Sequence, residues 1–122
     1  MSPFTPIFIP GLLCTEFLFA KQRATLANAG LICDTRQHDS IKEMAQVALD
    51  QCTGRLVPVG LSKGGCAALE MARLAPGRIA GMALLSTNAL VDNDERANAR
   101  RHAIKLATHK GLKALREAFY RN

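Results

Sequence analysis

A serine flanked by glycines is the feature of this sequence that could do chemistry. Residues 57–65 read Val-Pro-Val-Gly-Leu-Ser-Lys-Gly-Gly, so Ser62 stands between Gly60 and Gly64 in the pattern G-x-S-x-G. An apolar strand-like segment precedes the pattern and a helix-like segment follows it, which predicts a sharp strand-to-helix turn. Glycines avoid clashes across such a turn, and Gly65 lets the helix approach the strand closely. The pattern therefore predicts an exposed serine nucleophile.

Two backbone N–H groups are candidates for an oxyanion hole, the site that binds the negative oxygen formed when a serine attacks a carbonyl. The Lys63 N–H lies at the start of the predicted helix, where free N–H groups and the helix dipole favour negative charge. The second donor is expected in the glycine turn at residues 9–14, Ile-Pro-Gly-Leu-Leu-Cys, which follows the first apolar strand. Leu12 is the first candidate there and Leu13 the second, although the Pro-Gly pair alone is equally consistent with a plain turn.

The Lys63 side chain allows several interpretations. A flexible cation beside the nucleophile could attract anionic substrates or help to polarise Ser62. We expect it simply to reach solvent.

The elements that must position this serine alternate in the manner of βαβ units, which predicts an α/β fold with a mostly parallel sheet between two helix layers. The expected strands are residues 7–9, 31–33, 56–59 and 79–85, in the order 2-1-3-4. The last strand is an almost continuous apolar run of the kind that is buried on both faces.

Capping residues predict where the helices begin and end. Thr15 is placed to cap a helix over residues 15–28 that turns Phe17, Ala20 and Ala24 to one face and ends at Gly30. Ser40-Ile-Lys-Glu43 forms a capping box, followed by an apolar stripe over Ile41, Met44, Ala45 and Ala48. A helix over residues 63–74 turns small side chains to the sheet, on a face made of Gly65, Ala68, Leu69 and Ala72.

The C-terminal part of the sequence changes pattern after Asn88. Asp92 or Asp94 is expected to cap a helix over residues 93–108, and Gly111 to separate it from a second amphipathic helix. We therefore divide the chain into a core, residues 1–90, and a helical segment, residues 91–122.

Charge and composition exclude several classes of function. The net charge is +6. Residues 1–90 hold eight basic and six acidic side chains, and residues 91–122 hold eight basic and four acidic side chains. The basic residues at the C-terminus are interleaved with Ala and Leu, so we interpret them as a solvated helix face and expect no nucleic acid. The sequence contains no apolar run long enough for a membrane span and no signal peptide at its start, so a cytoplasmic protein is expected.

The four cysteines do not form a metal or redox motif. They are widely separated, contain no C-x-x-C pair and lie in or beside apolar segments, which favours buried free thiols: Cys14, Cys33, Cys52 and Cys66. No phosphate-binding glycine motif occurs either. We expect no metal and no cofactor.

Three motifs together resemble the small lipase, esterase and C–C hydrolase type of the α/β-hydrolase fold superfamily. Pro10-Gly11-Leu12 resembles its His-Gly-x oxyanion turn, residues 34–40 (Asp-Thr-Arg-Gln-His-Asp-Ser) resemble its D-x-R-G-H-G-x-S loop, and residues 60–65 resemble its G-x-S-x-G-G elbow. The resemblance covers the N-terminal half of such a protein, about residues 6–90, and residues 91–122 resemble the start of its helical cap. It implies a serine hydrolase acting on an ester or related acyl bond of a small molecule.

The resemblance also indicates what this sequence lacks. In the family the acid and the histidine that activate the serine follow it on later loops, and the sequence ends first. Local substitutes are poor candidates, because each has a plainer role as a loop, turn, capping or helix-surface residue: Asp34, His38, Asp39, Asp92, Asp94, His102 and His109.

We therefore expect little turnover, with the base and acid supplied from outside these residues or by a second subunit. The alternative is a non-catalytic module, derived from a hydrolase, that binds a partner. The Ile79–Leu85 strand, at the edge of the sheet, invites self-association.

Overall fold

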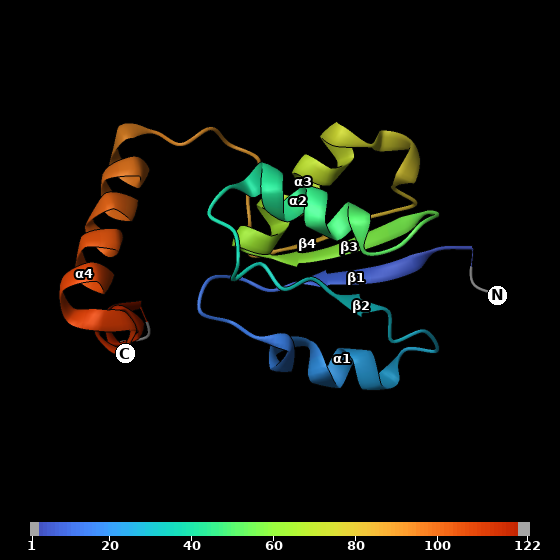
Figure 1. Cartoon of the computed structure of the whole chain (residues 1–122), viewed down its shortest axis with the longest axis horizontal. Coiled ribbons are helices and arrows are strands. Elements are labelled where there is room, and N and C mark those ends of the chain that lie inside the picture. The colour runs from blue at the N-terminus through green and yellow to red at the C-terminus, as the bar shows by residue number, and fades with distance from the viewer. Residues whose placement is uncertain (1–2, 120–122) are drawn as a thin grey trace. The chain divides into compact units, whose positions relative to one another are not determined.

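The structure is a computed structural model that describes residues 3–119 of the 122. The chain divides into two compact units, one ending at Ala89 and one beginning at Leu90 (Figure 1).

The first unit is built on a four-stranded sheet in which every neighbouring pair is parallel. The strands are β1 (Thr5–Ile9), β2 (Leu31–Ile32), β3 (Leu56–Leu61) and β4 (Ala83–Leu85). Their order is β2-β1-β3-β4, which confirms the predicted α/β fold and strand order. The central strand β3 is in register with β1 along five residue pairs, from Thr5 opposite Leu56 to Ile9 opposite Gly60. The carboxyl ends of β1 and β3 therefore lie side by side.

Strand β4 is shorter than predicted. Pro76–Arg78 forms a 3-10 turn, Ile79 makes only an isolated bridge to Leu56, and the strand proper begins at Ala83. Leu84 and Leu85 are each 42% exposed, so the expectation of a strand buried on both faces is wrong. The apolar run is interrupted at the exposed Gly81, which lacks a side chain to pack.

Helices α2 (Ile41–Asp50) and α3 (Lys63–Leu74) lie on one face of the sheet, and α1 (Ala20–Thr25) lies on the other (Figure 1). Helix α2 begins as predicted, because the Ser40 hydroxyl accepts a hydrogen bond from the Glu43 N–H at 3.0 Å. Helix α3 covers the predicted residues, but its buried face also includes Ala67 and Met71, while Leu69 and Ala72 are only half-buried. Strand and helix residues together form the core: Ile7, Ile9, Ala45, Ala48, Leu56, Ala67, Ala68 and Met71.

The segment after β1 differs from the single helix predicted there. A 3-10 helix, η1 (Glu16–Phe19), precedes the short α1, although Thr15 caps its start as predicted by accepting from the Phe17 N–H at 3.4 Å. Because a 3-10 turn has fewer residues than an α-helical turn, the buried face is shifted: Phe17 is 81% exposed and Phe19 is buried. The helix ends at Thr25, so Gly30 does not terminate it.

The second unit consists of α4 (Asp94–Phe119), interrupted at Gly111, where φ is 85° and ψ is 171°. The break is as predicted, but the cap is not. Asn93 Oδ1 accepts the Arg96 N–H at 2.8 Å, whereas Asp92 pairs with Arg100 at 3.0 Å. Within residues 3–119, no helix is both long enough and apolar enough to cross a membrane.

Candidate active site

Ser62 occupies the strand-to-helix turn between β3 and α3 in a strained conformation. Its φ is 54° and its ψ is −113°, a region that residues with a side chain rarely adopt, and the residue is exposed. Hydrogen bonds hold the backbone in place: the Ser62 N–H donates to Leu85 O at 2.9 Å, and Ser62 O accepts from the Thr87 hydroxyl at 2.9 Å. Strain that is maintained in this way is characteristic of functional sites.

The three glycines around Ser62 are required by close backbone approaches. A Cβ atom on Gly60 would lie 2.6 Å from Gly65 N, and one on Gly65 would lie 2.7 Å from Thr87 Cβ. A Cβ atom on Gly64 would lie 2.6 Å from the carbonyl carbon of Ile9. The glycine pattern therefore serves the turn and the packing of α3 against β1.

The loop after β1 lies directly against Ser62. A Cβ atom on Gly11 would be 3.4 Å from Ser62 Cβ and 3.1 Å from Leu61 O. The loop is a tight turn, in which the Cys14 N–H donates to Gly11 O at 3.2 Å and Leu13 has a φ of 62°. The fold thus brings the segment that contains Leu12 to the serine, although the two are 50 residues apart in the sequence.

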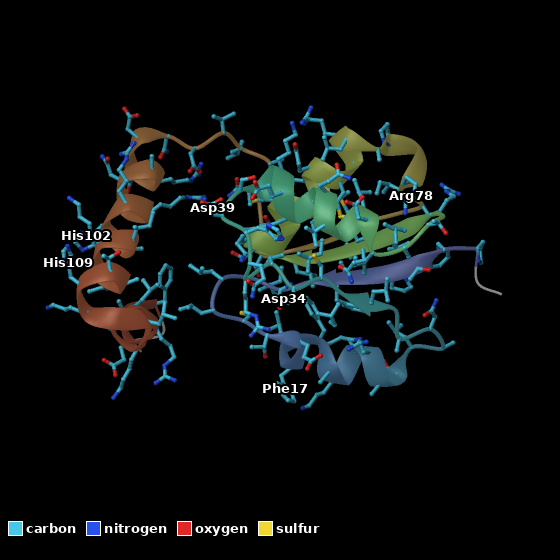
Figure 2. The ribbon with its side chains drawn as sticks, viewed as in Figure 1. Phe17, Asp34, Asp39, Arg78, His102 and His109 are labelled. Atoms are coloured by element: carbon cyan, nitrogen blue, oxygen red, sulfur yellow. The ribbon has the colours of Figure 1, made fainter. Side chains whose placement is uncertain are left out.

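A cavity of about 490 Å³ lies at the carboxyl ends of β1 and β2, within the size range of small-molecule sites. Phe17 and Asp34, labelled in Figure 2, come from its two walls, the segments that follow β1 and β2. The lining residues are Pro10, Cys14, Thr15, Glu16, Phe17, Ile32, Cys33, Asp34, Thr35 and Arg36.

The Lys63 side chain does not simply reach solvent, and that expectation is wrong. It is partly buried, and its Nζ donates to Thr35 Oγ1 at 2.9 Å. Burial lowers the pKa of the Lys63 ammonium, because desolvation disfavours the charged form. No local pattern around either residue predicts this contact, since it joins residues 28 positions apart.

Two further groups that line the cavity, the Asp34 carboxylate and the Cys33 thiol, are poor candidates for catalysis. Arg36 donates to both oxygens of Asp34 at 2.9 Å, and this pairing lowers the pKa of Asp34 to about 2. Burial raises the pKa of the Cys33 thiol to about 11, so it is a poor nucleophile. Cys33 is buried as predicted, while the other three thiols are free but only partly buried.

None of the histidines is shown to pair with Ser62. His38 Nδ1 lies 3.7 Å from Glu43 Oε2, in agreement with a structural role. His102 and His109 are exposed on α4, in the second unit (Figure 2). Among residues 3–119, no side chain forms a hydrogen bond with the Ser62 hydroxyl.

No family model and no curated protein matches this sequence. A solved structure of a thermophilic esterase from Thermogutta terrifontis, with malate bound, is similar to it, with a TM-score of 0.75 and 24% sequence identity. The match covers 87% of this chain and 45% of the esterase, so the chain spans less than half the length of that protein. The similarity supports the α/β fold with its parallel sheet.

Proposed function

We propose that this chain carries the nucleophile and the oxyanion hole of a serine hydrolase that acts on an ester or related acyl bond. In this proposal Ser62 attacks the carbonyl carbon, and the Leu12 and Lys63 N–H groups bind the resulting oxyanion. Residues 1–90 form the catalytic core and residues 91–122 a cap-like segment.

The observation that carries the proposal is the strained, exposed Ser62 against the β1 loop. A positive φ at a non-glycine residue costs about 1–3 kcal/mol, and a turn without a function would more readily carry glycine. The position of Gly11 supports the oxyanion role of the next residue, because a Cβ atom added there would touch Ser62 Cβ, so the loop backbone lies beside the serine. Lys63, the first residue of α3, supplies the second N–H.

The general base is the part of the machinery that the core unit does not supply. Among the described residues of that unit, the one histidine is His38, and it faces Glu43. An oxyanion hole and substrate binding without a triad still accelerate a reaction by roughly 10³–10⁴-fold over water. We therefore assign to these residues slow acylation of Ser62, which a base from another segment or subunit would accelerate.

Covalent labelling with a fluorophosphonate tests the proposal. We expect labelling of the wild-type chain that is lost in Ser62→Ala and is accelerated by added imidazole, which can act as an external base at this exposed serine. Ser86→Ala is the matched control, because Ser86 is also exposed, follows the neighbouring strand and has a φ of 47°.

Two results would count against the proposal. Labelling that persists in Ser62→Ala would place the reactive group elsewhere. No labelling, even with imidazole, would favour the alternative, a hydrolase-derived module that binds a partner without catalysis.

A further inference from the structure

The Lys63 ammonium is a partly buried cation that has no carboxylate beside it. Among residues 3–119 no acidic oxygen lies within 4.0 Å of its Nζ, and its one hydrogen bond is to the neutral Thr35 hydroxyl at 2.9 Å. An ammonium has three N–H donors, so two remain available. Because burial removes water from this charge, an anionic partner would stabilise it.

Thr35 extends this donor group into the cavity. The residue lines the cavity and is only 5% exposed. Its oxygen accepts from Lys63, which leaves its own O–H proton as a donor, and no acceptor for that proton is found in the described part of the chain. A buried hydroxyl and a partly buried ammonium therefore offer their donors at one point.

The acidic side chains of the cavity neutralise Lys63 only in part. Asp34 is bound at both oxygens by Arg36, and although its charge also acts on Lys63, desolvation is the larger effect and the Lys63 pKa stays lowered. Glu16 is exposed, and its charge acts on Arg36, whose pKa it helps to raise. A partly compensated cation with one neutral donor beside it suits a monoanion such as a carboxylate.

The cavity lies next to the loop that borders the serine. Its lining includes Thr35 and Pro10, and Pro10 precedes Gly11, where an added Cβ atom would lie 3.4 Å from Ser62 Cβ. At about 490 Å³ it has room for a small substrate but not for a long acyl chain together with a large alcohol.

We propose that Lys63 and Thr35 bind the carboxylate of a substrate whose ester carbonyl lies at Ser62, so that the preferred substrates are small esters carrying a free acid, such as half-esters of dicarboxylic acids. This inference rests on the proposed function for the identity of the reacting bond. It adds the substrate class and a specificity-determining role for the Lys63 side chain, separate from that of its backbone.

The test measures binding in the absence of turnover. In a Ser62→Ala background, the affinity for monomethyl succinate, which carries a carboxylate, is compared by calorimetry or NMR titration with that for the neutral dimethyl succinate. We expect Lys63→Met to weaken the binding of monomethyl succinate at least about 10-fold, which is the scale of a lost charge-assisted hydrogen bond. The affinity for dimethyl succinate should stay unchanged. Lys42→Met is the control, since Lys42 is an exposed lysine whose charge acts on Glu70.

The outcomes separate this inference from the proposed function. Absence of monomethyl succinate binding, or equal weakening of both esters by Lys63→Met, overturns the carboxylate site, provided that the variant has the circular dichroism and melting temperature of its parent. Binding that depends on Lys63 supports the site even if fluorophosphonate labelling shows that Ser62 is inert. If fluorophosphonate labels Ser62 but the chain does not bind monomethyl succinate more tightly than dimethyl succinate, the hydrolase proposal is supported and the proposed substrate class is rejected.

Discussion

Replacement of Gly64 by alanine sets two physical effects against each other. Gly64 lies in the first turn of α3, and alanine is favoured over glycine in a helix by about 1 kcal/mol. The new Cβ, however, would lie 2.6 Å from the carbonyl carbon of Ile9 and 3.0 Å from Pro10 O. Two carbon atoms need about 3.5 Å, and the Ile9 carbonyl oxygen lies closer still, so α3 and β1 must separate by at least roughly 0.9 Å.

The backbone of β1 cannot rotate away as a side chain could, so we expect the upper part of the usual overpacking cost, about 3 kcal/mol. After the helical gain, Gly64→Ala should lower the free energy of unfolding by about 2 kcal/mol. Urea denaturation measures this as a fall in the transition midpoint at constant slope.

Gly77→Ala is the matched control for this substitution. A Cβ atom there has no neighbour within 4 Å, so stability should stay the same or rise by less than about 1 kcal/mol. If Gly64→Ala is as stable as Gly77→Ala, the close packing of the elbow on β1 is refuted.

Three further predictions concern stability, pH and association. Arg78, at the amino-terminal end of the sheet (Figure 2), donates to the carbonyl oxygens of Leu49, Cys52 and Gly54. Arg78→Met should therefore lower the free energy of unfolding by about 2 kcal/mol. Arg73→Met, which loses only a surface pair with Glu70, should leave it almost unchanged, and equal losses in urea denaturation would contradict this. The pKa of Asp34 is lowered from its usual 3.8 to about 2, so its pairing stabilises the fold above pH 3.8 and this contribution is lost as the pH falls through 2. The pair is exposed, so solvent screening keeps this contribution small. NMR titration should find the Asp34 pKa restored toward 3.8 in Arg36→Gln, and an unchanged pKa would exclude Arg36 as the cause. The edge strand β4 should mediate self-association that Leu84→Lys weakens, and light scattering that finds a wild-type monomer at high concentration would reject it.

The parts of the fold that the sequence predicted are those controlled by local patterns. Helix α3 begins and ends as predicted, because Gly60 and Gly64 mark its entry and Pro76 follows its end. The start of α2 follows from one side-chain cap at Ser40. The parallel pairing of the strands follows from the alternation of short apolar runs with helices.

The parts that were missed depend on contacts between distant segments. The exposure of Leu84 and Leu85 was missed although the predicted strand order places β4 at the edge of the sheet, because the apolar composition of the run was interpreted as burial on both faces. The contact between Lys63 and Thr35 requires the β2 loop and the elbow to meet, and no residue near either one predicts it. The close approach of Gly11 to Ser62 was predicted only indirectly, because an oxyanion donor was expected in the glycine turn after the first strand.

The central claim, that Ser62 is a nucleophile served by two backbone donors, is tested most directly by a crystal structure of the fluorophosphonate-treated chain. We expect phosphorus bonded to Ser62 Oγ, with one phosphonyl oxygen 2.7–3.1 Å from the backbone nitrogens of Leu12 and Lys63, the range for an oxyanion hole. A covalent adduct on another residue, or an adduct on Ser62 whose oxygens point to solvent away from both nitrogens, would contradict it.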